Sequence, residues 1–312
     1  MAYGGSNVGT SGKYSQATVQ GSGNVRKFYG NRGVFGGGYT GSYVDTVDYS
    51  TIAVTGNAVD FAELSAGREM EEACSDGVRG VWQGGGVGPT DVVDYINIGV
   101  FANALDFGNL TQARRHIWAA SNGSRALCGD GYTTTNVDTI DYITISTPSN
   151  SVDFGSMTNA GNGRGSVSDG VRAVLGGGSA PGIVDTMEYL AIDTKGIAAD
   201  FGELTLARRQ PGSLSDGSRG VYGGGQAPTG VEANIDFINI ATLGNATAFG
   251  LLQQSSQSRS GCADGSRGLF NGGYKTTVLD DIDYLNIQTS GYTVDFGNLT
   301  QARSGAGACS GD

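Results

Sequence analysis

Side chains that could carry out catalysis are scarce in this sequence. It has one histidine, His116, which stands beside Arg114 and Arg115, and it has no Gly-x-Ser-x-Gly motif. A lone histidine in such a basic connection is more often a surface residue than a general base. The tripeptide Asp-Phe-Gly at 106–108 matches the magnesium motif of kinases, but neither a phosphate loop that opens a helix nor a catalytic-loop signature accompanies it. We therefore expect no enzymatic activity, no catalytic residue and no cofactor.

Carboxylates recur at fixed spacings and could bind a cation. An Asp-x-x-Asp pattern occurs at Asp45/Asp48, Asp91/Asp94, Asp138/Asp141 and Asp280/Asp283. Calcium favours such oxygen clusters, but residues three apart in a strand point to opposite faces, so one pair cannot chelate one ion. Asp-Gly followed by Arg occurs at 76–77, 169–170, 216–217 and 264–265. An ion-binding ring is one interpretation of these sites. Hairpin turns with Asp capping and Arg pairing are the one we favour, so no metal is expected.

Cysteine usage and charge limit the compartment and the partners. The four cysteines, Cys74, Cys128, Cys262 and Cys309, show no CxxC spacing and are expected to be buried free thiols of a protein made in a reducing cytoplasm. The formal net charge of −11 argues against nucleic acid or an anionic membrane as the main partner. No segment resembles a signal peptide or a membrane span, so membrane insertion is not expected.

Internal repeats account for most of the chain. Six copies begin with an Arg that precedes a small and two apolar residues, at Arg32, Arg79, Arg125, Arg172, Arg219 and Arg267. The spacings are 47, 46, 47, 47 and 48 residues. Two further markers keep the same period: Tyr49, Tyr95, Tyr142, Tyr189, Phe237 and Tyr284, and then Phe61, Phe107, Phe154, Phe201, Phe249 and Phe296. A shared period in three independent markers predicts a repeat architecture.

Each copy has the pattern of four short strands. In the second copy these are 70–75, 79–82, 92–98 and 104–110, separated by turn residues. The third strand of the next copy, at 140–145, has apolar side chains on both faces, which a sheet with one wet face would not show. A blade packed between two neighbouring blades would show this pattern, because both of its faces are buried. The sequence predicts an all-β, six-bladed β-propeller with four-stranded antiparallel blades over residues 32–312.

The repeat resembles that of kelch proteins, in which paired glycines, a Tyr, an aromatic residue and an Arg follow one another in each blade. The matching glycines are Gly37-Gly38, Gly85-Gly86, Gly177-Gly178, Gly224-Gly225 and Gly272-Gly273, and the matching arginines are Arg68, Arg114, Arg208 and Arg303. The chain departs from kelch in its Phe in place of Trp, in a longer Tyr-to-Phe interval, and in Asp130-Gly131 of the third copy. The run at 106–114, Asp-Phe-Gly-Asn-Leu-Thr-Gln-Ala-Arg, also resembles repeats of structural proteins of tailed phages. This resemblance implies a virion component made in the host cytoplasm.

Two segments could complete the first blade, because the first copy lacks its first strand. Residues 303–309 have the small-residue pattern of the other first strands, and residues 24–30 are the alternative. We favour closure by the C-terminal strand, which joins the two ends of the ring and removes its open edge.

Partner contact is expected at two places. The loops after the glycine runs differ in every copy, and together with the connections between copies they supply Tyr39, Tyr43, Arg68, Arg114, Tyr132, Asn136, Tyr274 and Lys275. Residues 1–31 form a basic, glycine-rich arm without Asp or Glu, which we expect to lie on a neighbouring subunit or another protein through Tyr3, Lys13, Tyr14, Arg26, Lys27 and Phe28.

The function expected from these features is that of a non-enzymatic structural or interaction module, in a phage tail, fibre or surface decoration, with other protein subunits as partners. A carbohydrate-binding propeller that meets a host surface glycan is the alternative. A kelch-type oxidase is a distant third, because its copper chemistry needs several His and Tyr ligands and this chain has one histidine.

Overall fold

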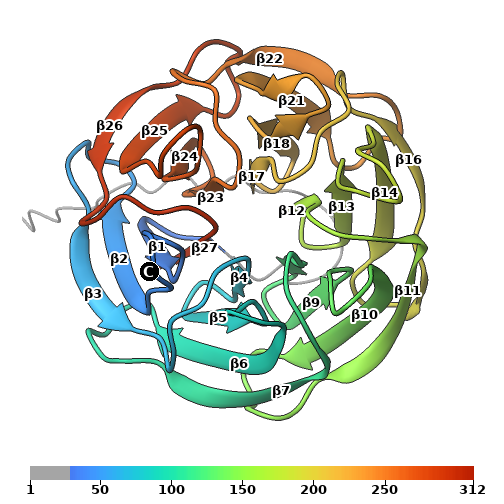
Figure 1. Ribbon diagram of the computed structural model, residues 1–312, viewed down its shortest axis with the longest axis horizontal. Coiled ribbons are helices and arrows are strands. Elements are labelled where there is room, and N and C mark those ends of the chain that lie inside the picture. The colour runs from blue at the N-terminus through green and yellow to red at the C-terminus, as the bar shows by residue number, and fades with distance from the viewer. Residues whose placement is uncertain (1–28) are drawn as a thin grey trace, which may run out of the picture.

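A computed structural model describes residues 29–312, so the contacts expected of Tyr3, Lys13, Tyr14, Arg26, Lys27 and Phe28 lie outside the described residues. The described chain forms a closed ring of six antiparallel sheets, a six-bladed β-propeller, as predicted (Figure 1). Within residues 29–312 there is no helix long and apolar enough to cross a membrane.

The strands of each blade run from the channel outward and are called a, b, c and d. Blade 1 has β27 (Gly307–Gly311), β1 (Arg32–Gly36), β2 (Thr46–Thr51) and β3 (Val59–Glu63). Blade 2 has β4 (Glu72–Ser75), β5 (Arg79–Gln83), β6 (Thr90–Asn97) and β7 (Leu105–Arg114). Blade 3 has β8 (Trp118–Ser121), β9 (Arg125–Gly129), β10 (Val137–Thr144) and β11 (Val152–Gly161).

The other three blades follow the same order. Blade 4 has β12 (Gly165–Ser168), β13 (Arg172–Gly176), β14 (Thr186–Ala191) and β16 (Ala199–Glu203). Blade 5 has β17 (Gly212–Ser215), β18 (Arg219–Gly223), β21 (Asn234–Asn239) and β22 (Thr247–Leu251), and blade 6 has β23 (Ser260–Ala263), β24 (Arg267–Asn271), β25 (Asp281–Asn286) and β26 (Val294–Asn298). Three short strands are additional: β15 (Gly196–Ile197) pairs with β11, and β19 (Gln226–Ala227) pairs with β20 (Gly230–Val231) in a loop of blade 5.

The C-terminal strand closes the ring as predicted. β27 pairs with β1 from Arg32↔Gly311 to Gly36↔Gly307, and Figure 1 shows the first and the last strand of the described chain side by side in one blade. The strand begins four residues later and ends two residues later than the expected 303–309, because Arg303 is needed in the connection before it. The alternative with residues 24–30 is wrong, since β27 occupies the place beside β1.

Each gap between neighbouring blades holds its own hydrophobic cluster, which explains the apolar residues on both faces of the c strands. Between blades 1 and 2 the cluster includes Val47, Phe61, Trp82 and Ile96, all buried. The other five gaps are filled in the same way. Burial of this kind is the main favourable term in folding, and here it holds neighbouring blades together.

The three markers of the repeat form one stack in every blade. In blade 2 the guanidinium of Arg79 lies 4.4 Å from the ring centre of Tyr95, whose ring meets Phe107 edge to face at 5.8 Å. The same Arg also donates from Nη1 to the carbonyl of Ile145 in the next blade, at 2.6 Å. All six blades repeat this bond to the following blade. The expected hairpin turns are present, and Asp76 Oδ1 accepts from the backbone N–H of Arg79. The Arg side chain pairs with an aromatic ring and a carbonyl, however, and not with the Asp.

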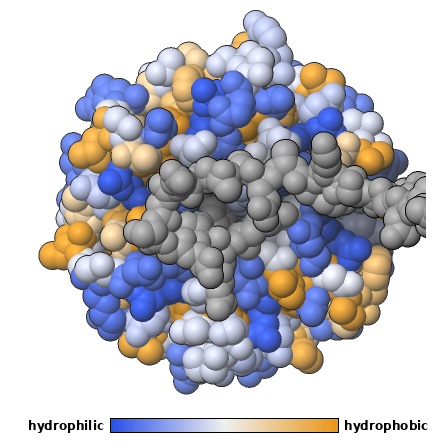
Figure 2. Space-filling model, turned by 180° about the vertical axis from the view of Figure 1, so that it is seen from behind, coloured by the Kyte–Doolittle hydropathy of each residue, from blue (hydrophilic) through white to orange (hydrophobic). Residues whose placement is uncertain are grey.

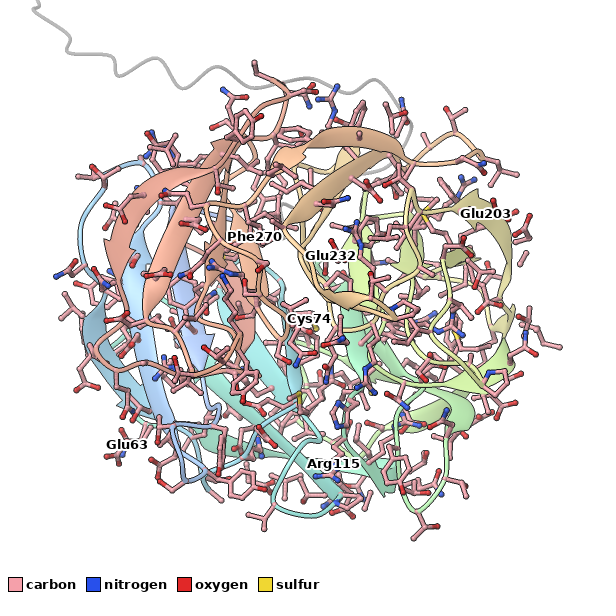
Figure 3. All side chains as sticks on the ribbon, turned by 45° about the horizontal axis from the view of Figure 1, so that its top comes forward. Glu63, Cys74, Arg115, Glu203, Glu232 and Phe270 are labelled. Atoms are coloured by element: carbon pink, nitrogen blue, oxygen red, sulfur yellow. The ribbon has the colours of Figure 1, made fainter. Side chains whose placement is uncertain are left out.

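The strand order gives the ring two faces that carry different kinds of connection. The loop face carries the b–c loops (37–45, 84–89, 130–136, 177–185, 224–233 and 272–280) and the connections between blades. The turn face carries the a–b turns (such as 76–78 and 264–266) and the c–d turns (such as 98–104 and 192–198). Between them, the innermost strands lie near the centre and the d strands form the rim: Cys74 lies centrally in Figure 3, whereas Glu63 and Glu203 lie at the periphery.

Candidate interaction surface

The loops of the loop face are held to a common backbone frame although their sequences differ. After the glycine pair, or after Asp130-Gly131 in blade 3, the next residue bonds to the connection that enters the same blade. In blade 2 the pair at this place is Gly84-Gly85 and not the expected Gly85-Gly86, because it is Gly86 whose N–H donates to the carbonyl of Glu69. The N–H of Tyr39 donates to the carbonyl of Ser304 at 2.8 Å, and the N–H of Tyr274 to that of Gln257, also at 2.8 Å. Paired glycines with φ values of 72° and 111° at Gly37 and Gly38 permit the turn that makes this contact, a conformation that other residues rarely adopt. Variable side chains are thus presented from a fixed scaffold.

Six of the eight predicted contact residues lie on these loops with at least part of the side chain accessible. In blade 1 the rings of Tyr39 and Tyr43 meet edge to face at 5.3 Å. In the adjacent blade 6, Tyr274 is 39% exposed and is followed by the exposed Lys275. The neighbouring blades 1 and 6 therefore both present tyrosine side chains on the loop face.

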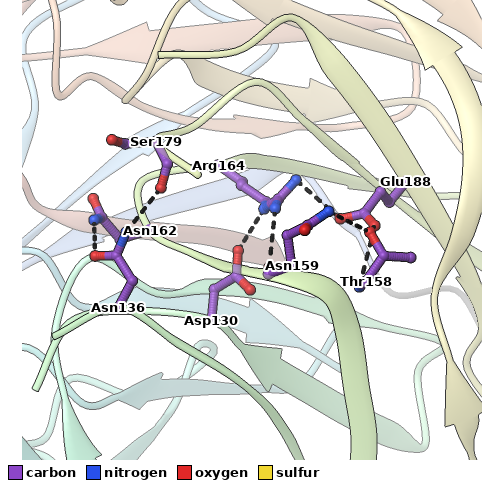
Figure 4. Close-up of polar contacts among 8 residues, drawn as sticks. All are labelled: Asp130, Asn136, Thr158, Asn159, Asn162, Arg164, Ser179 and Glu188. Atoms are coloured by element: carbon purple, nitrogen blue, oxygen red, sulfur yellow. Dashed lines mark hydrogen bonds and ion pairs between the residues drawn. The ribbon is translucent and has the colours of Figure 1, made fainter. Parts of the chain in front are cut away.

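The other two loop residues, Tyr132 and Asn136, belong to blade 3. The guanidinium of Arg115 lies 5.9 Å from the ring centre of Tyr132. Asn136 donates to the carbonyl of Ser179 in blade 4 and accepts from Asn162 in the connection that enters blade 4 (Figure 4). Its amide therefore joins neighbouring loops and is only partly free for a partner.

Arg68 and Arg114 are placed inside the protein. Only 2% of Arg68 and none of Arg114 is exposed. Their guanidinium groups form ion pairs of 3.0 and 2.9 Å with Asp94 and Asp141 of the blade that follows. The two arginines support the loop face from below and do not line it.

A single type of clamp joins the blades and explains the second Asp of each Asp-x-x-Asp pair. In blade 3, Asp141 accepts from Arg114, from the hydroxyl of Thr111 at 2.6 Å and from its N–H at 3.0 Å. The register between strands c and d shifts beside this acid, between Ile140 and Asp141. Such a bulge re-aims a side chain. The corresponding acids elsewhere, each beside the same shift, are Asp48, Asp94, Glu188, Asp236 and Asp283.

Two of the arginines that form these clamps were not identified from the sequence. In the connections before blades 4 and 6 the seventh residue after the marker Phe is Gly161 or Ser256, and the Arg comes three residues later, as Arg164 or Arg259. Arg164 nevertheless reaches Glu188 at 3.0 Å and also Asp130 at 2.5 Å (Figure 4). Asp130 is the residue that replaces the first glycine of the pair in blade 3. The sequence did contain a signal for this ion pair, since Asp130 and Arg164 both depart from the pattern of the repeat.

A closed ring of backbone hydrogen bonds surrounds the channel mouth on the loop face. One residue per connection has a positive φ of 54–66° and donates its N–H to the equivalent carbonyl of the preceding blade at 2.7–3.0 Å: Met70, His116, Gly163, Gln210, Ser258 and Gly305. Four of these six are not glycine. The left-handed conformation costs such residues about 1–3 kcal/mol each, which the shared ring of bonds offsets.

Side chains from three of these residues meet across the mouth. Nε2 of Gln210 lies 3.0 Å from Nδ1 of His116 and 3.6 Å from Sδ of Met70. Burial, with a smaller effect of Arg115 and then Arg209, lowers the pKa of His116 from 6.5 to about 4. The imidazole is therefore neutral at pH 7 and accepts from the Gln210 amide. This gives the lone histidine a structural contact at the mouth.

Small residues fill the channel behind the mouth. A cavity of about 90 Å³ is lined by the a strands and by Tyr29. Serine hydroxyls ring it, and each donates to the carbonyl of the equivalent residue in the preceding blade: Ser75 to Ser310, Ser121 to Ser75, Ser168 to Ser121, Ser215 to Ser168 and Ser310 to Ala263, at 2.5–2.9 Å. Ala263 of blade 6 occupies the sixth position of this serine ring and supplies no hydroxyl.

The four cysteines are buried and free, as expected. Cys309 packs so closely that a Cβ added at Gly80 would lie 2.8 Å from its Sγ. Burial raises the pKa of all four thiols, that of Cys128 to about 11. Among residues 29–312 no group of three or more His, Cys, Asp or Glu side chains is arranged to hold a metal ion.

No family model matches the chain, and no curated protein matches it at a significant level.

Proposed function

We propose that the protein is a non-enzymatic interaction module that binds a partner protein with its loop face. The observation that carries this proposal is the combination of a uniform backbone frame with side chains that change from blade to blade. The Tyr39, Tyr132 and Tyr274 loops share the same backbone bonds to their connections. The corresponding positions in blades 2, 4 and 5 are Gly86, Ser179 and Gln226. Rigid scaffolds that carry variable Tyr-, Ser- and Thr-rich loops are typical of binding surfaces.

The setting that we propose is a virion, with other subunits of the particle as the partners of the propeller. Support comes from the resemblance of the run at 106–114 to repeats of tailed-phage structural proteins. Its Thr111 and Arg114 clamp Asp141 of the next blade. The motif thereby has a structural role, that of joining rigid blades, which suits a particle component.

Carbohydrate binding at the same face is the second candidate. Tyr274 favours it, since this residue is 39% exposed and is followed by the exposed residues 275–277, Lys-Thr-Thr. An accessible aromatic ring beside hydroxyl groups can stack on a sugar ring while neighbouring side chains bond to its hydroxyls. Host surface glycan would be the ligand in that case.

Binding of matched variants to the native particle tests the proposal. The loop-face variant combines Tyr39→Ala, Tyr132→Ala and Tyr274→Ala, and the turn-face control combines Val54→Ala, Ile197→Ala and Tyr292→Ala. At about 1–2 kcal/mol for each aromatic contact, the loop-face variant should bind roughly 100-fold more weakly or worse, while the control keeps its affinity. A loss confined to the turn-face variant would overturn the proposal. A glycan array probed with the same proteins would favour the second candidate if a sugar is bound and the loop-face variant loses it.

A further inference from the structure

The exposed apolar side chains of the propeller are concentrated on the face opposite the proposed partner surface. Of the fifteen large hydrophobic residues that are exposed within residues 29–312, twelve lie in the a–b turns, the c–d turns or the first residues of the d strands. Only Val87, Leu251 and Tyr274 lie toward the loop face. Figure 2 shows the turn face, with groups of apolar residues around its margin. Such concentration on one side indicates an interaction surface.

Several of these exposed side chains come from c–d turns of successive blades. Ile197 of blade 4 is 71% exposed, Leu243 of blade 5 is 53% exposed and Tyr292 of blade 6 is 73% exposed. Phe101 of blade 2 is 58% exposed and meets the ring of Tyr49 of blade 1 edge to face at 5.3 Å. An occupant of this face would thus find apolar contacts in four of the six blades.

The described chain begins at the centre of this same face. The ring of Tyr29 lies against the a–b turns of blades 5 and 6, so that a Cβ added at Gly265 would lie 2.5 Å from it. Gly30 packs against Gly311 and Asp312 at the end of β27. Residues 1–28 are therefore attached to the propeller at the middle of the turn face. A tethered segment has an effective concentration of roughly mM at nearby sites, and 28 residues span up to about 90–100 Å, which reaches every blade.

Charge also favours contact between residues 1–28 and the turn face. Residues 1–28 carry Lys13, Arg26 and Lys27 and no acidic residue. Residues 29–312 carry the other 16 basic residues and all 30 acidic ones, a formal charge of −14. Exposed acids follow the rim beside the apolar turns at Asp60, Asp106, Asp153, Asp200 and Asp295. The aromatic side chains of the segment, Tyr3, Tyr14 and Phe28, provide apolar groups for the turns.

We propose that residues 1–28 bind the turn face of their own propeller, with aromatic side chains against the exposed turns and basic side chains against the acidic rim. The sequence alone favoured a neighbouring subunit as the site of the arm. The position of Tyr29 and the apolar turns around it favour the same chain. The segment would cover the turn face and leave the loop face free, so this inference does not depend on the proposed function.

Site-specific photo-crosslinking in the full-length protein tests the proposal. p-Benzoylphenylalanine replaces Leu243 or Ile197 on the turn face, and Val87, which is 66% exposed on the loop face, serves as the matched control. The protein is irradiated at about 1 µM, far below the effective concentration of a tethered segment, as an equal mixture of unlabelled and ¹⁵N-labelled chains. Cross-linked peptides are then identified by mass spectrometry.

The expected result is a set of cross-links from positions 243 and 197 to residues 1–28, at least several-fold more abundant than from position 87, with both peptides from the same isotopic population. Equal or greater cross-linking from position 87, or none from the turn face, would overturn the proposal. Cross-links that join labelled to unlabelled peptides at the statistical ratio would also overturn it, and would assign the turn face to the segment of a second copy.

Discussion

Arg303 and Asp48 lie 255 positions apart in the chain, and their side chains form a fully buried ion pair with 3.1 Å between Nη2 and Oδ2. Thr300 donates to the same carboxylate from both its hydroxyl and its N–H. The same kind of clamp joins the other five pairs of neighbouring blades. Together with β27, the pair of Arg303 and Asp48 therefore closes the ring where its last blade meets its first.

Loss of this clamp should destabilise the whole ring. Arg303→Met leaves Asp48 as an unpaired buried charge, which costs about 3–5 kcal/mol, and urea unfolding should show a loss of that size. Hydrogen exchange should rise first in β27 and β1. Arg68→Met, inside the ring, should cost a similar free energy without this local effect, and Lys275→Met on the surface should change stability by less than about 0.5 kcal/mol. A stable Arg303→Met protein with unchanged exchange would show that the clamp does not fasten the ring.

Completion of the serine ring should stabilise the protein. Ala263→Ser places a hydroxyl where it can donate to the carbonyl of Ser215, the one link that the ring lacks. A net hydrogen bond contributes about 0.5–1.5 kcal/mol, and urea unfolding should show a gain in this range. Ser121→Ala removes an existing link and should lower stability by a comparable amount. If Ala263→Ser is neutral or destabilising, the ring of hydroxyls does not contribute as we infer.

His116 should titrate with a pKa near 4, which NMR can follow without ambiguity because the chain has one histidine. The unfolded chain binds this proton at about 6.5, so the stability that the neutral imidazole contributes is present above pH 6.5 and is lost as the pH falls toward 4. Gln210→Ala removes the amide that covers Nδ1 and should raise the pKa toward 6.5. A midpoint near 6.5 in the unaltered protein would mean that the mouth is open to solvent.

The four thiols should be unreactive in the folded protein. Each is buried, and burial raises the pKa of each above its usual value, so the reactive thiolate is scarce at pH 8. A thiol reagent at pH 8 should modify none of them in the native state and all four after denaturation. Fewer than four reactive thiols in the denatured, unreduced chain would reveal a disulfide that this fold does not accommodate.

The architecture could be predicted from the sequence more completely than the positions of the individual arginine side chains. The Arg, Tyr and Phe markers could be recognised because each blade needs the same stack, as in Arg79, Tyr95 and Phe107, so selection for packing repeats the residues at one spacing. Arg164 could not be placed, because it reaches the equivalent acid from a different position in the chain. Arg68 and Arg114 were assigned to the surface because spacing does not show in which direction a long side chain points.

The most direct measurement of the central claim is an electron cryo-microscopy map of the native particle or complex that contains the full-length protein. We expect partner density over the b–c loops of blades 1, 3 and 6, in contact with Tyr39, Tyr132 and Tyr274. A map in which the loop face points to solvent and the partner contacts only the turn face or the rim would contradict it.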